Sequence, residues 1–226
     1  MHAHNDLSPA PLTDNDLLEW FQNNFTPKKD WRIGTEHELF VFDLKTKNPA
    51  PFEGEASIQA LMQKMAEFGW QPDYKNGYIM RMKRDGASLT LEPAGQFELS
   101  GAPFKTLHET ADELKTHFKE IKQAGEALGL GFLPIGFHPT HSLEDMPIVP
   151  NKRHKKMRAN MPGFGEMYRT CTVQVNLDYS SEQDMADKMR VSMALQPIAI
   201  ALWANSPFEE GKKTDYLSLR SHCWTK

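Results

Sequence analysis

The sequence contains few cysteines and no long basic or apolar run, and each of these absences excludes a class of protein. Its 226 residues include only two cysteines, Cys171 and Cys223, which are too few for a disulfide framework and do not form a Cys-x-x-Cys pair. Both thiols are therefore expected to be reduced. The longest basic stretch is 152–156 and the formal net charge is −4, so the charge pattern does not favour a nucleic-acid-binding protein.

The sequence also lacks the patterns that are typical of membrane-spanning and secretory segments. No apolar stretch reaches the roughly 18 residues that span a bilayer, and Met1–Asp6 lacks the charged and then apolar pattern of a signal peptide. We expect no membrane partner, and a cytoplasmic location follows by default. Because no repeat, low-complexity segment or long linker occurs, we expect one domain over 1–226, in which about residues 1–30 form a leading helix.

Hydrophobic periodicity and turn residues predict a chain of the α+β class. Helices are expected within 13–25 and over 55–68, 106–128, 151–161 and 182–203. Strands are expected over 32–43, 78–83, 87–101 with a Pro-Ala-Gly kink, 131–137 and 168–178. The dipeptides Asn76-Gly77 and Asp85-Gly86 predict tight turns. The second half of the last helix is apolar nearly all round, which predicts that it is buried, with a kink at Pro197.

Two acids lie on one side of the strand expected over 32–43. Side chains alternate along a strand, so Glu36 and Glu38 point the same way. Like charges this close destabilise each other unless a cation or a proton lies between them, which makes a divalent-metal site one explanation. A solvated strand face is the ordinary alternative.

A second pair of acids, Glu92 and Glu98, lies on the short strands that flank the Pro-Ala-Gly kink. Their neighbours are apolar or small, and an unpaired charge is costly in such surroundings. A hairpin with acids beside its turn is the simpler alternative. We predict that Glu36, Glu38, Glu92 and Glu98 converge on one divalent-metal site.

The strand expected over 168–178 alternates between polar and apolar residues. Its polar side fits equally a face exposed to solvent and the hydrogen-bonding wall of a cleft. Cys171 falls on the apolar side, so we expect a buried thiol with a packing role. His138 and His141 are interpreted as loop histidines, because Pro139 breaks the helix that would align them as metal ligands.

Six segments together carry a family resemblance: Gly34–Glu38, Leu91–Gly101, Arg169–Asp178, Ala194–Ala199, Ala204–Phe208 and Arg220–His222. In this order they resemble glutamate-cysteine ligase of the plant and proteobacterial type, over Arg32 to Trp224. The resemblance implies a glutamine-synthetase-like fold, in which a curved antiparallel sheet forms a funnel with helices outside. It also implies that this chain is an N-terminal portion with an incomplete funnel, since family members continue beyond the Arg-Ser-His segment.

The resemblance implies ATP- and Mg²⁺-dependent ligation of the glutamate γ-carboxylate to the amino group of cysteine through a γ-glutamyl phosphate, the first step of glutathione biosynthesis. Mg²⁺ prefers oxygen ligands, which the glutamates named above supply. The other residues that the resemblance implies are Gln174 and Asn176 for catalysis and nucleotide binding, Lys83 for nucleotide binding, Arg220 for catalysis and substrate binding, and Thr172, Met167 and Trp224 for substrate binding.

The chain departs from the family pattern at Ala94, where a glycine tolerant of positive φ is usual. Three alternatives remain open: a ligase for another amine acceptor, a catalytically silent fragment that binds metal or nucleotide, and a metal-dependent hydrolase. The hydrolase needs an ordered histidine and carboxylate triad, and the nine histidines show no such spacing. As a fragment, the chain is expected to expose a strand edge, to self-associate and to be a poor ligase alone.

Overall fold

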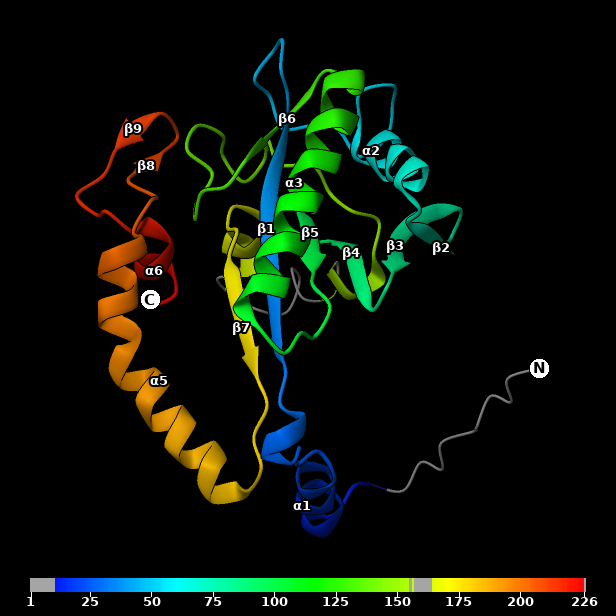
Figure 1. Ribbon diagram of the computed structural model, residues 1–226. Coiled ribbons are helices and arrows are strands. Elements are labelled where there is room, and N and C mark those ends of the chain that lie inside the picture. Colours follow the sequence, from blue (N-terminus) through cyan, green and yellow to red (C-terminus); the bar gives the residue numbers. More distant parts are fainter. Residues whose placement is uncertain (1–10, 155, 157–163, 226) are drawn as a thin grey trace. The chain divides into compact units, whose positions relative to one another are not determined.

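The computed structural model describes residues 11–154, 156 and 164–225 (Figure 1). The chain forms two compact units, one comprising the chain up to Trp31 with Asp178–Ala194, and the other comprising Arg32–Leu177 with the chain from Leu195. Within the described ranges, no helix is both long enough and apolar enough to cross a membrane.

The first unit is helical. It contains α1 (Asp14–Asn23), the 3-10 turn η1 (Lys28–Asp30) and the first part of α5 (Glu182–Trp203). A capping box begins α1, in which the Thr13 and Asp16 side chains each accept a hydrogen bond from the other's backbone amide. The Lys188 ammonium lies 3.4 Å from the centre of the Trp31 ring, which ties α5 to the chain that follows η1.

The second unit is built on an open antiparallel sheet of seven strands. The strand order is β2-β3-β4-β5-β1-β6, and β7 also pairs with β1. The strands are β1 (Ile33–Asp43), β2 (Gln71–Lys75), β3 (Tyr78–Arg84), β4 (Ala87–Leu91), β5 (Phe97–Ser100), β6 (Leu130–Leu133) and β7 (Val173–Leu177). β1 is the centre of the sheet, because β5 and β7 pair with its first half and β6 pairs with its second half. A separate hairpin consists of β8 (Phe208–Glu209) and β9 (Lys212–Lys213).

Local sequence signals position the helices of this unit, which are α2 (Ile58–Met65) with η2 (Ala66–Phe68), α3 (Leu107–Leu128), η3 (Phe164–Tyr168) and α6 (Leu219–Cys223). Ser57 caps α2, and Gly69 ends the following turn with φ 88°. Thr106 and Glu109 form a capping box on α3, and Gly129 ends it with φ 72°. The two predicted turns are confirmed, since all four of their residues have positive φ.

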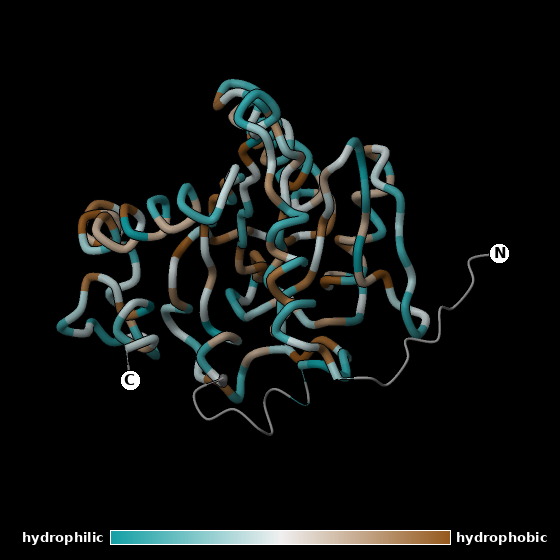
Figure 2. The backbone as a smooth tube through the Cα atoms, turned by 90° about the horizontal axis from the view of Figure 1, so that it is seen from below, coloured by the Kyte–Doolittle hydropathy of each residue, from teal (hydrophilic) through white to brown (hydrophobic). Residues whose placement is uncertain are grey.

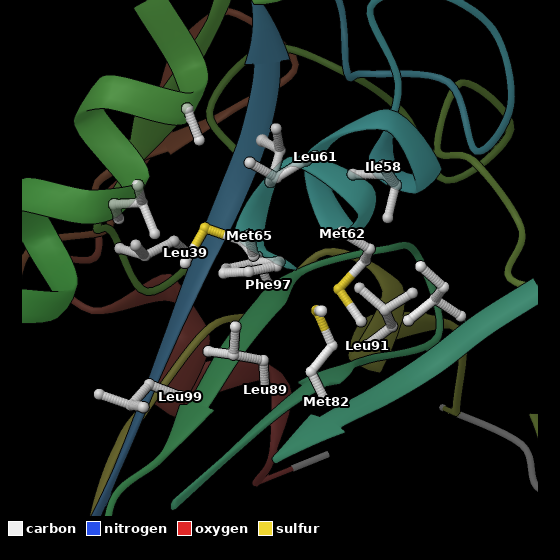
Figure 3. Close-up of a cluster of buried hydrophobic side chains, with 14 of the residues drawn as sticks. Leu39, Ile58, Leu61, Met62, Met65, Met82, Leu89, Leu91, Phe97 and Leu99 are labelled. Atoms are coloured by element: carbon white, nitrogen blue, oxygen red, sulfur yellow. The ribbon is translucent and has the colours of Figure 1, made fainter. Parts of the chain in front are cut away.

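The hydrophobic core lies between one face of the sheet and the helices α2 and α3 (Figure 3). Its labelled members are Leu39, Ile58, Leu61, Met62, Met65, Met82, Leu89, Leu91, Phe97 and Leu99. Leu89 and Leu99 are cross-strand partners and are both buried. Burial of each such side chain contributes about 1.5–3 kcal/mol, so this face stabilises the sheet and leaves the other face for polar residues.

Three elements differ from their predicted extents. The strand expected from Tyr168 begins only at Val173, because Tyr168 and Cys171 turn into a small buried cluster with Phe40 instead of running along β1. β6 ends at Leu133, directly before Pro134, which has no backbone N–H to donate to the sheet. The helix expected over 151–161 is seen at 152–154 and 156. Asn151 precedes it, and 155 and 157–161 lie outside the described part of the chain.

The burial predicted for the second half of α5 is wrong. Pro197 lies inside the helix, and no residue of α5 is buried. Leu195, Ile198 and Leu202 have 51%, 56% and 69% of their surface exposed. Figure 2 shows this half of α5 largely in hydrophobic colours. The prediction assumed packing partners on every side of an apolar helix, and the described residues supply none that bury it.

Candidate active site

The register of the sheet places two rows of polar side chains on one face. Cross-strand partners project to the same face, which here is the face opposite the core. The first row is Thr90, Glu98 and Glu38, and the second row is Ser88, Ser100, Glu36 and Gln174. Glu36 and Glu38 therefore lie on one face, as predicted. The same register brings Glu98 of β5 directly beside Glu38 of β1.

Glu98 and Glu92 meet at the turn between β4 and β5. Glu98 is buried and accepts hydrogen bonds from Thr90 Oγ1 at 2.6 Å and from Ser100 Oγ at 3.1 Å. Burial raises the pKa of Glu92 to about 7, and the nearby charges of Glu38 and Glu98 raise it further. Glu92 also shares a hydrogen bond with Glu98. The two carboxyl groups therefore lie side by side at this turn.

Glu38 joins the same group from β1. Burial raises its pKa to about 7 in spite of the Thr172 hydroxyl and backbone amide, which donate to its oxygens at 3.1 and 2.9 Å. Gln174 Nε2 donates to the same carboxylate at 3.4 Å. Glu38, Glu92 and Glu98 thus form a three-carboxylate cluster, in which burial and mutual repulsion outweigh the attraction of Arg220 to Glu38 and of Arg153 to Glu92.

Glu36 lies outside this carboxylate cluster. Its carboxylate accepts a hydrogen bond from Asn176 Nδ2 at 2.9 Å, and it is not among the main causes that raise the pKa of Glu38 or Glu92. Residues two apart on a strand are separated by about 6.5 Å, so Glu36 belongs to the neighbouring row. The structure brings together Glu38, Glu92 and Glu98, three of the four predicted metal ligands. The fourth, Glu36, lies two residues away from Glu38 on β1.

The carboxylate cluster has the chemistry of a site for a hard cation. All of its donors are carboxylate oxygens, and the pKa values of Glu38 and Glu92 are raised by burial and by the repulsion among the three carboxylates. Within the described residues, no three His, Cys, Asp or Glu side chains already have the arrangement of a metal site. The carboxyl groups instead bond to hydroxyls, amides and each other, so binding of a cation requires side-chain rearrangement.

The other predicted site residues lie at different distances from this cluster. Arg220 of α6 acts on the charges of Glu38 and Cys171, and its buried Nε has no hydrogen-bond partner within the described structure. Burial lowers the pKa of Arg220. Met167 lies in η3, where its carbonyl accepts a hydrogen bond from a buried glutamine. Trp224 ends α6 with half of its surface exposed. Lys83 lies on β3, two strands away from Glu98.

Sequence reasoning missed Gln96, whose side chain links the turn between Glu92 and Glu98 to the segment before β7. Its side-chain oxygen accepts from Ala94 N at 2.9 Å, while its Nε2 donates to the carbonyls of Met167 and Thr170 at 2.7 and 2.9 Å. Gln96 is 1% exposed and joins the Glu92–Glu98 turn to the segment that leads into β7. The available signal was an amide directly before a short strand, in the turn between Glu92 and Glu98.

Cys171 is buried and reduced, as predicted. Burial raises the pKa of its thiol well above the usual value, and the nearby Glu38 and Glu92 carboxylates raise it further. The thiol therefore adjoins the carboxylate cluster, which the strand pattern did not indicate.

Comparison with known proteins identifies the family. The model of Glutamate-cysteine ligase family 2 (GCS2) matches residues 32–226. Over 221 residues the chain is 49% identical to glutamate-cysteine ligase B, chloroplastic, of Oryza sativa subsp. japonica, covering 95% of this chain and 44% of the relative. It is 48% identical over 225 residues to the chloroplastic glutamate-cysteine ligases of Nicotiana tabacum and Arabidopsis thaliana, covering 97% of this chain and 42% of each relative.

These relatives correct the expected location of the protein, and they show how much of a full-length family member this chain represents. The cytoplasmic location expected by default is contradicted, because the similar plant enzymes are named as chloroplastic. The chain spans less than half the length of the curated relatives that it matches. A match over most of its residues shows that the chain belongs to the glutamate-cysteine ligase family 2.

Proposed function

We propose that this chain takes part in joining the γ-carboxylate of glutamate to the amino group of cysteine, with ATP and Mg²⁺, as the first step of glutathione biosynthesis. The observation that carries the proposal is the carboxylate cluster of Glu38, Glu92 and Glu98, which faces Arg220 in a chain of this family. A carboxylate and an amine do not condense unaided in water, so the carboxylate needs activation by phosphorylation.

The proposed reaction has two steps. The γ-carboxylate oxygen of glutamate attacks the γ-phosphorus of ATP and releases ADP. The cysteine amine then attacks the carbonyl carbon of γ-glutamyl phosphate, phosphate leaves, and the nitrogen loses a proton. Bound Mg²⁺ would neutralise the phosphate charges that otherwise repel the attacking carboxylate.

The residues of the cluster have distinct proposed roles. Glu38, Glu92 and Glu98 hold the metal, and Glu36 extends the set along β1. Thr172, Gln174 and Asn176 fix the carboxylates of β1 by the hydrogen bonds described above, which makes them positioning residues in the described structure. Arg220 binds a substrate carboxylate or the transferred phosphoryl group, for which a planar guanidinium is suited.

Three further assignments belong to the same proposal. Met167 and Trp224 contact substrate, and Lys83 contacts nucleotide phosphate. The open sheet forms part of a glutamine-synthetase-like funnel, whose inner face is the face of the carboxylate rows.

The test is the dependence of nucleotide binding on Mg²⁺. ADP with Mg²⁺ should raise the melting temperature of the chain more than ADP with EDTA. Glu38→Gln should remove this difference, whereas Asp112→Asn, on an exposed face of α3, should leave it unchanged. Equal stabilisation with and without Mg²⁺, or an unchanged response in Glu38→Gln, would exclude the metal role.

Product formation tests the reaction itself. The chain is incubated with ATP, Mg²⁺, glutamate and cysteine, and γ-glutamylcysteine is measured by mass spectrometry. Replacing cysteine with other amines tests the alternative of a different acceptor. A product formed more readily with another amine would replace cysteine in the proposal.

A second candidate function is binding of metal and nucleotide without turnover by the chain alone. It is favoured by the outer side of β7, where Val173, Val175 and Leu177 expose 69%, 59% and 54% of their surface. Such a row is unfavourable in water and suits contact with another chain, including a second copy. Nucleotide binding without product, in a self-associating protein, would support this alternative. The hydrolase alternative needs an ordered group of histidine with carboxylates, and the nine histidines show no such spacing.

A further inference from the structure

The side chain of Arg220 is placed by the backbone and the stem that carry it. Within the described residues its guanidinium makes no hydrogen bond or ion pair, and its buried Nε has no partner. Burial lowers the pKa of Arg220, and the nearby charges of Glu38 and Cys171 oppose this shift. The contacts that hold α6 and the arginine stem therefore decide where the guanidinium lies relative to the carboxylate cluster.

Ser206 holds the start of α6. It is 2% exposed and forms a parallel bridge with Ser218. Its N–H donates to the Leu217 carbonyl at 3.0 Å, and its carbonyl accepts from the Leu219 N–H at 2.9 Å. Its hydroxyl oxygen accepts from the backbone N–H of Arg220 at 3.4 Å. The hydroxyl and the backbone of one buried serine therefore fix the residue from which the guanidinium projects.

Asn205 ties this segment to the loop that follows β6. Its Oδ1 accepts from the Gly136 N–H at 3.0 Å, and its Nδ2 donates to the Pro134 carbonyl at 3.3 Å. The Gly136 carbonyl in turn accepts from the Cys171 N–H at 3.3 Å, and the residue after Cys171 is the threonine that binds Glu38. A short chain of hydrogen bonds thus connects the segment before α6 to the carboxylate cluster.

Gly136 lies against the stem of Arg220. A Cβ atom at this position would lie 3.3 Å from Arg220 Cδ, 3.3 Å from Ser206 Oγ and 3.2 Å from Asn205 Oδ1. Carbon atoms in good contact are about 3.5–4.0 Å apart, so a methyl group here would press on all three neighbours at once. The absence of a side chain lets the loop close on the arginine stem and on both residues that hold α6.

These contacts also stabilise the fold, and docking of a chain segment is their ordinary role. Two features indicate a role in the site as well. The contacts meet at the backbone N–H and the Cδ of a single residue, Arg220, and that residue faces the carboxylate cluster without a side-chain partner to hold it. A planar guanidinium binds an anion through paired hydrogen bonds, which a small displacement misaligns.

We propose that Gly136, Asn205 and Ser206 are positioning residues that hold the Arg220 guanidinium opposite the carboxylate cluster, where it binds a carboxylate of glutamate beside the metal. This inference rests on the proposed function for the ligand of Arg220, and it adds which residues fix the separation between the arginine and the metal. None of the three binds substrate or metal directly, and each acts through Arg220.

The test measures glutamate binding to the full chain by calorimetry with Mg²⁺ and ADP present. The variants are Gly136→Ala, which crowds the arginine stem, and Asn205→Leu, which removes two hydrogen bonds at similar side-chain size. The control is Gln59→Leu in α2, which likewise removes an amide that accepts from one backbone N–H and donates to one carbonyl, both of Ile79. Mn²⁺ titration followed by electron paramagnetic resonance reports on the carboxylates, and the melting temperature reports on the fold.

Both variants should bind glutamate about tenfold or more weakly, because the displaced guanidinium no longer aligns its paired donors. Their Mn²⁺ affinity should not change, and Gln59→Leu should lower the melting temperature without affecting either ligand. Arg220→Lys keeps the charge but replaces the planar fork with a point charge on a flexible stem, which tolerates displacement. Adding Gly136→Ala to Arg220→Lys should therefore weaken glutamate binding by less than about twofold, which a role in stability alone would not produce.

Equal glutamate affinity in either variant and the unaltered chain would overturn the inference and leave the proposed function standing. Additive losses from Gly136→Ala and Arg220→Lys, or a comparable loss of glutamate affinity in Gln59→Leu, would show a role in stability only. If the unaltered chain binds Mn²⁺ but not glutamate, the proposed substrate role of Arg220 fails together with the inference. If it binds neither, the proposed function fails as a whole.

Discussion

Replacement of Gln96 by leucine should weaken both the fold and the carboxylate cluster. Leucine has a similar size, so it preserves apolar packing while removing the buried amide. One backbone N–H, at Ala94, and two carbonyls, at Met167 and Thr170, then lose their partner. The change separates the role of the amide from the role of the side-chain volume.

The magnitude follows from the groups left without partners. A buried polar group without a hydrogen bond costs about 1–3 kcal/mol, and carbonyls are less sensitive than N–H groups because they have a second lone pair. For the three groups around Gln96 we expect a loss on the order of 3 kcal/mol in the free energy of unfolding. Because Ala94 lies in the turn between Glu92 and Glu98, we also expect about a tenfold loss in Mn²⁺ affinity, as for other partners that orient metal ligands.

Gln59 provides a matched control. It is also buried, and its amide exchanges two hydrogen bonds with the backbone of Ile79, at 2.9 and 3.0 Å. Gln59→Leu should cost on the order of 2 kcal/mol in stability and leave Mn²⁺ affinity unchanged. Urea unfolding and Mn²⁺ titration of both variants measure the two effects. Equal Mn²⁺ affinities in the two variants, or a stability loss below about 1 kcal/mol for Gln96→Leu, would refute the reasoning.

Three further predictions concern the core. Burial lowers the pKa of His117 to about 3, so its neutral form stabilises the fold above about pH 6.5 and this contribution is lost as the pH falls. Relative to His117→Leu, the unaltered chain should lose about 1.6 kcal/mol in the free energy of unfolding between pH 6.5 and 5, measured by urea unfolding at each pH. Cys171 should react with iodoacetamide only as fast as the chain unfolds, followed by mass spectrometry, and fast labelling in the folded protein would contradict its burial. Glu120→Gln should cost about 3 kcal/mol in thermal or urea unfolding, because the guanidinium of Arg84 loses a largely buried partner, whereas Asp112→Asn removes an exposed ion pair and should cost less than about 0.5 kcal/mol.

The parts of the fold that could be predicted from sequence are those that depend on neighbouring residues. The capping box of Thr106 and Glu109 involves residues three apart, and the turn at Asn76-Gly77 is specified by the backbone freedom of its own two residues. The exposed second half of α5 could not be predicted in this way, because burial depends on what packs against a helix and its sequence reports only its own composition.

The carboxylate cluster could be predicted only in part from the sequence. The spacing of Glu36 and Glu38 was enough to place both side chains on one face, but it could not separate their roles. Their separation follows from pairing with β5 and β7, which brings Glu98 beside Glu38 and Asn176 to Glu36. Strand pairing joins residues that are far apart in the chain, so no local pattern contains it.

The alternation of polar and apolar residues in β7 also could not predict which side of the strand faces the site. It further shows why the register of the strand matters for the proposed function. The pattern distinguished a polar side from an apolar side without indicating which one faces the site. In the structure the polar side faces the carboxylates, through Gln174 and Asn176, while the apolar side remains exposed. Since side chains alternate with a period of two, a slip of one residue would turn both amides away and put valines against Glu36 and Glu38. The hydrogen bonds from Thr172 and Asn176 to these glutamates therefore select the register that completes the cluster, so the same contacts hold the strand and prepare the site.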